Sequence, residues 1–338
     1  MGLIDLRYGT NPIPLDNAAI ASIAAEAVRK LNEYPDQSCT KIKRAIAKSL
    51  GRGFSSGNVL VGNGLDSVIN TIAESVLGGR KGNGAVAVPS FYVFSAAMRK
   101  LGARVLEFPL SEGTFSLDVR KFSDEMKQRG TDLCFLANPN NPTGNLLIQD
   151  KSGLLKLAGS CKLLIVDECY YGFCKQTFVR ETLELENLVV LRSLSKSYGL
   201  AGLRLGYAVS RKENIERLGR VASACRPFDA GTISQEIGTW AVGRKNRLAE
   251  FAQLKDDFLR LLRDSCGAEV SGTETSFLLL KVADSEEFGK RLALEGVLVN
   301  TLAPYKMGER YVRIGIPPRR LFAKVAKAVV RATNNNKG

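Results

Sequence analysis

The sequence predicts an α/β protein in which a mostly parallel, seven-stranded sheet is sandwiched by helices and accompanied by a smaller α+β domain. The first observation is a series of apolar runs rich in β-branched residues. Several are continuous rather than alternating, which is typical of strands buried on both faces. The second is that helical patterns, such as Asp66–Leu77 and Lys151–Ala158, separate these runs, and this alternation favours a parallel sheet. The expected strands are Val59–Val61, Ala85–Val88, Arg104–Phe108, Leu133–Ala137, Leu163–Val166, Leu188–Leu191 and Leu205–Val209.

The smaller domain is expected from a change of pattern after about residue 225. A long amphipathic stretch, Ile233–Cys266, predicts a helix. Residues 15–32 are also expected to be helical and, because they precede the first strand of the large sheet, to pack with the smaller domain. We therefore expect a large domain at 33–225 and a small domain formed by 1–32 and 226–338. Its other elements are expected at Ser276–Val282, Val297–Val299, Tyr311–Ile316 and Leu321–Ala332.

The composition excludes several classes of function. The 338 residues include no histidine, which rules out Ser-His-Asp and Cys-His hydrolases and histidine-ligated metal centres. Acid–base chemistry near neutral pH must then use lysine, tyrosine, cysteine or a carboxylate. The seven cysteines are scattered and form no CxxC pair, so we expect no disulfide framework, no metal site and a cytoplasmic location.

The net charge of +14 does not predict a nucleic-acid partner. The 48 basic residues are spread along the chain among 34 acidic ones, and no long Lys/Arg block occurs. Attraction of anionic substrates, or solubility, explains the charge. No apolar run reaches the roughly 18 to 20 residues that cross a bilayer, so no membrane partner is expected either.

The segment LRSLSKSYGLAGLRLGY, at Leu191–Tyr207, carries the strongest chemical signal. It places Lys196 on a polar turn directly after an expected strand, with Ser193 three residues before it and Arg204 eight residues after it. A lysine held there is placed to form a Schiff base, and the hydroxyl and guanidinium suit a phosphate. Binding of pyridoxal 5′-phosphate (PLP) requires this combination. Most lysines are solvated surface residues, so Lys196 is either a PLP lysine or a surface lysine. The residues at the ends of the other expected strands distinguish the two interpretations.

Two further segments place polar groups after expected strands, where ligands bind in open α/β sheets. Gly64, Leu65 and Asp66 form a glycine turn that opens a helix and offers free amides to a phosphate. Such turns are common, and this one is neither a P-loop nor a Rossmann fingerprint. Asn141 lies in ANPNNPTG, where two Asn-Pro steps either present amides at a strand end or only build a turn.

Asp167 follows the apolar run Leu163–Val166, so its carboxylate is expected to be buried and to need a cation. A protonated pyridine nitrogen is such a partner, and Tyr170 is then placed to donate to the neighbouring phenolic oxygen. The alternative is a carboxylate that caps the next helix. Lys196, once freed by substrate, can move the Cα proton if a cationic, partly desolvated site lowers its pKa.

The motifs ANPNNPTG, VDECYYGF and RSLSKSYGLAGLRLGY, in this order and spacing, resemble those of the fold-type I PLP-dependent aminotransferases of class I/II. Among these, the histidinol-phosphate aminotransferases are the most similar group. The resemblance runs from Leu6 to the C-terminal helix. It implies the fold-type I architecture, PLP as the cofactor, a homodimer, and amino transfer between a small-molecule amino donor and a 2-oxo acid such as 2-oxoglutarate.

The resemblance also implies roles for individual residues. Lys196 would form the Schiff base and Asp167 would pair with the pyridine nitrogen. Arg313, in YVRIGIP, matches the arginine that binds the substrate carboxylate, and Asn11 and Asn141 would also lie at the substrate. The other implied PLP contacts are Asn141 and Tyr170 at the O3′ oxygen, Phe91 stacked on the ring, and Gly64, Leu65, Asp66, Ser193, Arg204 and Tyr34 of a second subunit around the phosphate.

Two departures from the histidinol-phosphate pattern bear on the substrate. Asn-Pro is followed by Ile13 rather than Tyr, and Asn300 stands where the family has an arginine thought to help hold the substrate's phosphate or carboxylate. Lys306 and Arg310 are candidate substitutes. Three interpretations stay open. The first is an aminotransferase that acts on histidinol phosphate or on aromatic or other amino acids. The second is a decarboxylase resembling threonine-phosphate decarboxylase, and the third is a non-catalytic or nucleic-acid-binding protein that keeps the fold.

Overall fold

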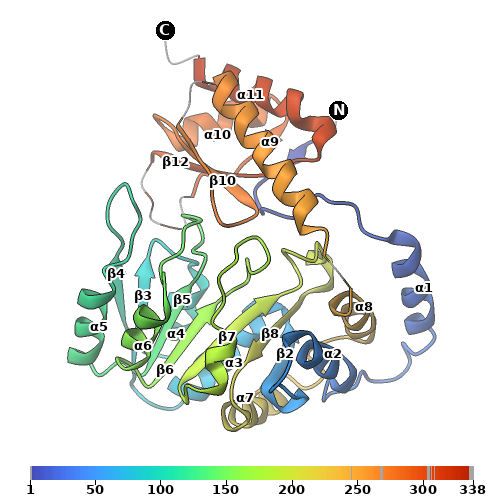
Figure 1. Cartoon of the computed structure of the whole chain (residues 1–338), viewed down its shortest axis with the longest axis vertical. Helices are drawn as coiled ribbons and strands as arrows, with labels where there is room; N and C mark the ends of the chain where they lie inside the picture. The colour runs from blue at the N-terminus through green and yellow to red at the C-terminus, as the bar shows by residue number, and fades with distance from the viewer. Residues whose placement is uncertain are drawn as a thin grey trace.

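The computed structural model describes residues 2–244, 246–266, 269–302, 305, 307 and 309–334. Its largest element is a seven-stranded sheet with the order β2-β8-β7-β6-β5-β3-β4 (Figure 1). Strand β8 runs antiparallel to both of its neighbours, and all other pairs are parallel. The strands are β2 (Val59–Asn63), β3 (Asn83–Val88), β4 (Arg104–Pro109), β5 (Leu133–Ala137), β6 (Leu163–Asp167), β7 (Leu188–Ser193) and β8 (Leu205–Val209). The predicted fold class is therefore confirmed.

The central strands are buried on both faces, which explains why their sequences read as continuous apolar runs. In β5, Leu133 and Phe135 face one hydrophobic cluster, whereas Cys134 and Leu136 face another on the opposite side of the sheet. None of these four side chains is more than 1% exposed. Side chains alternate along a strand, so two buried faces require an apolar residue at every position.

Helices cover both faces of this sheet. One layer consists of α2 (Thr40–Leu50), α5 (Val119–Gln128), α6 (Lys151–Ala158) and α8 (Thr232–Val242). The opposite layer consists of α3 (Gly64–Leu77), α4 (Val93–Lys100) and α7 (Lys212–Cys225). The turn that opens α3 and the loops after β5, β6 and β7 thus reach the same edge of the sheet.

A smaller α+β unit lies at one end of the molecule (Figure 1). It contains an antiparallel sheet of order β12-β10-β9 and a parallel pair, β1-β11. Among the described residues, no helix combines the length and apolar character needed to cross a membrane. The elements are β1 (Ile4–Asp5), β9 (Glu269–Ser271), β10 (Phe277–Lys281), β11 (Val297–Leu298), β12 (Tyr311–Gly315), α9 (Leu248–Cys266), α10 (Ser285–Leu294) and α11 (Phe322–Asn334).

The structure corrects two expectations about the helices. The stretch expected as one helix at 233–266 forms two, because α8 ends at Val242 and α9 begins at Leu248. Helix α8 packs on the core of the large sheet, and so does α1 (Asn17–Val28), which was expected to pack with the small domain. Only the segment before α1 joins the small core, through Leu6 and Ile13. We therefore propose domain boundaries near residues 14 and 244 rather than 32 and 226.

The contact between β8 and the turn that opens α3 gives a test of this packing. A Cβ on Gly206 would lie 2.6 Å from the backbone nitrogen of Leu65 and 2.8 Å from the carbonyl carbon of Gly64. Backbone atoms cannot rotate away, so we expect Gly206→Ala to lower the free energy of unfolding by about 1–3 kcal/mol. Gly202→Ala is the control, since a Cβ there meets nothing within 4 Å. Equal urea midpoints for the two variants would contradict the prediction.

Candidate active site

A cleft of about 400 Å³ lies where β5, β6 and β7 end. The carboxyl ends of parallel strands are the usual ligand position in such sheets. The cleft brings together side chains that are far apart in the sequence. The lining residues that the sequence predicted are Leu65, Asp66, Phe91, Asn141, Asp167, Tyr170, Ser193, Lys196, Arg204 and Arg313.

One end of the cleft is built for an anion. Arg204 Nη2 donates to Asp66 Oδ2 over 3.0 Å, and the two side chains are about half exposed. Gly64 has a φ of +76°, and a Cβ there would lie 2.5 Å from Arg204 Nη2. Glycine therefore leaves the space that the guanidinium occupies beside the first turn of α3. Free helix amides, this guanidinium and the Ser193 hydroxyl form a donor set suited to a phosphate.

Asp167 is a buried carboxylate with few partners. Its side chain is on the floor of the cleft, the residue is 3% exposed, and its Oδ1 accepts a hydrogen bond of 2.8 Å from the Cys169 amide. Burial raises the pKa of Asp167 to about 7, although the bonds from Cys169 oppose the shift. Among the described residues, no ion pair joins this carboxylate to a cation. A protonated ring nitrogen would supply the missing partner.

Lys196 shows the opposite electrostatic effect. Its Nζ donates to the backbone oxygen of Tyr8 over 2.7 Å and lies 5.4 Å from the centroid of the Tyr170 ring. Burial lowers the pKa of the amine to about 8, and the positive charges of Arg313 and Arg204 contribute to the shift. An amine with this pKa is available as a nucleophile and as a base near neutral pH.

Arg313, in β12, closes the cleft from the side of the small unit. It is 4% exposed, its Nη1 donates to Asn141 Oδ1, and its Nη2 donates to the Arg7 carbonyl over 2.8 Å. The guanidinium carbon lies 5.1 Å and 5.6 Å from the ring centroids of Phe277 and Tyr305. Its Nε is buried without a hydrogen-bond partner. A buried cation with an unused donor suits an anionic group of a ligand.

Three predicted site residues do not line the cleft of their own chain: Gly64, which lies beside Arg204 at the start of α3, Tyr34 and Asn11. Tyr34 is 83% exposed and stacks on Phe228 at 4.6 Å between centroids. Asn11 lies behind the loop that carries Lys196, in a neighbouring hollow. Its Nδ2 donates to the Ser197 carbonyl and its Oδ1 accepts from the Ile13 amide. Asn11 thus holds the loop that carries Lys196, and its substrate contact stays a prediction.

Several residues of the cleft were missed in the sequence. Tyr8 and Thr10 come from the chain after β1, and Tyr305 comes from a stretch without a strand or helix pattern. Cys169 and Ser195 lie inside the predicted motifs, and that position was the only sequence signal that they line the cleft. Lys306, a candidate cation for the substrate, lies outside the described residues. The other candidate, Arg310, is exposed and does not line the cleft.

The family follows from a comparison with known families. The chain matches aminotransferase class I and II over residues 2–329. It belongs to this family. As a class I/II aminotransferase the protein is a PLP-dependent enzyme, as the sequence predicted. The cleft fits that cofactor, because a phosphate donor set, a buried carboxylate lacking a cation and an amine of lowered pKa share one cavity.

Individual relatives carry more specific names. The chain is 31% identical to histidinol-phosphate aminotransferase of Caldanaerobacter subterraneus subsp. tengcongensis, over 85% of this chain and 80% of that protein. It has the fold of the Sinorhizobium meliloti histidinol-phosphate aminotransferase solved with pyridoxal-5′-phosphate, with a TM-score of 0.86, 21% identity and coverage of 99% and 91%. The fold is also that of L-threonine-O-3-phosphate decarboxylase from Porphyromonas gingivalis, with a TM-score of 0.79, 23% identity and coverage of 97% and 98%.

The raised pKa of Asp167 gives a testable effect on the cofactor-free aminotransferase. Between its usual pKa near 4 and about 7, the folded state holds a proton that the unfolded state has released, so stability falls as pH rises across this window. Asp167→Asn removes that loss. At pH 8 we expect the cofactor-free variant to be more stable than wild type by a few kcal/mol, while it binds PLP more weakly. Urea unfolding of the cofactor-free proteins measures the first effect, and equilibrium dialysis the second.

Asp124→Asn, on the exposed side of α5, is the matched control and should change neither quantity. A parallel loss of stability with pH in wild type and Asp167→Asn would contradict the prediction.

Proposed function

We propose that the protein transfers an amino group between an amino donor that carries an anionic group and a 2-oxo acid such as 2-oxoglutarate, in the cytoplasm. The observation that carries this proposal is the meeting of Lys196, Asp167 and Arg313 in one cleft, with an unused donor on the arginine. When bound, PLP supplies an aldehyde carbon for the amine and a ring that accepts the electrons released at Cα.

Each residue then has a defined task. Asp167 would hold the proton at the ring nitrogen, because its carboxylate is buried and needs a cation there. Lys196 would hold the aldehyde carbon through Nζ, and the same amine, once free, would move the Cα proton. Tyr170 and Asn141 would orient the O3′ oxygen, and Arg313 would bind the substrate's carboxylate or phosphate.

The phosphate and the ring have their own contacts in this proposal. Free amides in the Gly64–Asp66 turn, Ser193 and Arg204 would hold the phosphate, and Phe91 would stack on the ring. These tasks follow the family's motif positions, and the lining of the cleft supports them.

The amino donor is proposed from the relatives and from the cleft wall. Relatives named histidinol-phosphate aminotransferase support a donor of that type. Asn300, which replaces the family's arginine, pairs with Arg313 through the backbone, and its Oδ1 accepts from the Leu302 amide. It therefore adds no cation beside Arg313. The Phe91 and Tyr305 rings on the cleft wall favour an aromatic amino acid as the second candidate donor.

A homodimer is part of the proposal, with Tyr34 reaching the phosphate site of the other subunit. The support is that Tyr34 and Phe228 form a stacked pair on the surface, where they are 83% and 38% exposed. Exposed aromatic pairs are frequent at subunit interfaces. Tyr34 does not line the cleft of its own chain, so a contact with PLP would have to be made across the interface.

The first test offers histidinol phosphate, aromatic amino acids and threonine phosphate to the purified protein, each with 2-oxoglutarate, while glutamate and carbon dioxide are followed. We expect glutamate without carbon dioxide. Lys196→Ala should lose turnover and the PLP that borohydride fixes to the chain, as seen by mass spectrometry. Lys127→Ala, exposed on α5, is the control. Carbon dioxide without glutamate would instead favour the decarboxylase.

The second test co-expresses Tyr34→Ala with Lys196→Ala and assays the mixed dimers at limiting PLP. If Tyr34 acts across the interface, a mixed dimer holds one site with both residues intact and regains activity that neither parent shows. If Tyr34 acted within its own subunit, both sites of the mixed dimer would be defective. Mixed dimers as inactive as the parents would thus refute the cross-subunit role.

A further inference from the structure

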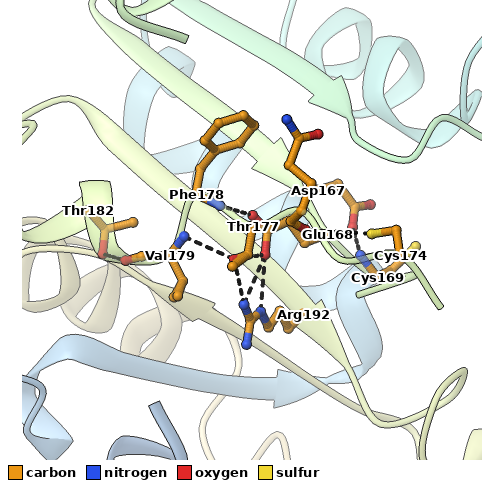
Figure 2. Close-up of polar contacts among 10 residues, drawn as sticks. Asp167, Glu168, Cys169, Cys174, Thr177, Phe178, Val179, Thr182 and Arg192 are labelled. Carbon is orange, nitrogen blue, oxygen red and sulfur yellow. Dashed lines mark hydrogen bonds and ion pairs between the residues drawn. The ribbon is translucent and has the colours of Figure 1, made fainter. Parts of the chain in front are cut away.

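A buried ion pair joins Arg192 to Glu168, which directly follows Asp167 of the cleft (Figure 2). Arg192, near the end of β7, is 6% exposed, and Glu168, just after β6, is 1% exposed. The Nε and Nη2 atoms of Arg192 lie 3.2 Å and 3.1 Å from Glu168 Oε2. Neither residue lines the cleft, so neither is placed to touch cofactor or substrate.

Arg192 makes two further contacts with the segment after β6. Its Nη2 donates to Thr177 Oγ1 over 2.7 Å, and its guanidinium carbon lies 3.5 Å from the centroid of the Tyr171 ring. Thr177 in turn donates to Glu168 Oε2 over 2.7 Å (Figure 2). The guanidinium therefore joins three points of one loop to the neighbouring strand.

Two of these three points, and Arg192 itself, are next in sequence to a residue of the cleft. Glu168 follows Asp167, and Tyr171 follows Tyr170. Arg192 itself precedes Ser193, which lines the cleft at the end proposed to hold the phosphate. One buried guanidinium thus contacts the sequence neighbours of cleft residues at the end of β6, in the loop after it and at the end of β7.

Stability alone is a weak reason for such a pair. Taking two charges out of water is costly, and apolar residues of similar volume often serve a core as well or better. The planar fork and the ring stacking of arginine instead specify a geometry, which a point charge does not. What needs a fixed geometry here is the cleft, because reacting groups displaced by about 1 Å can lose two orders of magnitude in rate.

We propose that Arg192, through Glu168, Thr177 and Tyr171, is a positioning residue that sets the relative placement of Asp167, Tyr170 and Ser193. This inference rests on the proposed function, since it concerns the groups that would hold PLP. It predicts that the effect of substitution falls on the chemical step and on the cofactor's environment, and not on substrate binding through Arg313.

The experiment compares holoenzyme of the wild type, Arg192→Lys, Arg192→Met and Glu168→Gln. For Arg192→Met we expect kcat to fall by about 100-fold, with KM near the wild-type value, because Arg313 is untouched. We also expect a shifted visible absorbance of bound PLP and weaker PLP retention in equilibrium dialysis. Arg192→Lys keeps the charge but lacks the fork and the stack, so it should move all three readouts in the same direction.

Asp132→Asn is the matched control. Asp132 is 7% exposed at the opposite end of β5, accepts from the Asn83 amide over 2.9 Å and pairs with Lys162 over 2.9 Å. Its substitution should lower the unfolding midpoint and leave kcat and the PLP absorbance unchanged.

The outcomes separate the inference from the proposed function. The inference would be overturned if Arg192→Lys kept the wild-type kcat and PLP absorbance. It would also be overturned if the Arg192 variants changed only the unfolding midpoint, as Asp132→Asn does. If Arg192→Met fails to fold, Arg192→Lys and Glu168→Gln decide the question. A wild-type protein that neither binds PLP nor forms glutamate would overturn the proposed function itself, before any variant is considered.

Discussion

The structure depends on the burial of one sheet from both sides. Strands β5, β6, β7 and β8 have no exposed residue, so there is no place along them for a charge without a partner. Polar chemistry is therefore restricted to the strand ends, where loops replace the helix layers. Asp167 and Ser193 are the last residues of β6 and β7, and Asn141 follows β5. The cleft is a consequence of this restriction as much as of the individual motifs.

Two kinds of buried charge lie within a few residues of each other and have opposite roles. The Glu168 and Arg192 side chains satisfy one another and their neighbours within the protein. Asp167 and Lys196, in contrast, are incompletely satisfied, and burial shifts their pKa values toward neutrality from opposite sides. In the proposed function, PLP would offset the cost of keeping them, because the ring nitrogen and the aldehyde carbon would supply what each group lacks. The first kind of charge is satisfied within the protein, and the second has capacity left for a ligand.

The sequence predicted the large sheet well because each buried strand leaves a continuous apolar run. The motifs at the strand ends, together with the family resemblance, predicted the cleft residues between Asp66 and Arg204, because these motifs directly follow such apolar runs. The break between α8 and α9 was missed because the apolar patterns on its two sides were treated as one helix, although the connecting sequence GRKNR at 243–247 has a glycine and no apolar residue. Tyr8 and Tyr305 were missed because they enter the cleft from segments that pair or pack only in three dimensions. The motif position of Asn11 does not reveal that its amide bonds to the backbone of Ser197 and Ile13 in a neighbouring hollow.

The missing histidine gives the cleft a further property. Histidine is the side chain that ordinarily exchanges protons at physiological pH, and this chain has none. Among the described residues, the carboxyl of Asp167 and the amine of Lys196, with pKa values of about 7 and about 8, are shifted by burial into that range and lie in the same cleft. Proton uptake or release on cofactor binding, measured as heat in buffers of different ionisation enthalpy, would therefore report on these two groups without a histidine background.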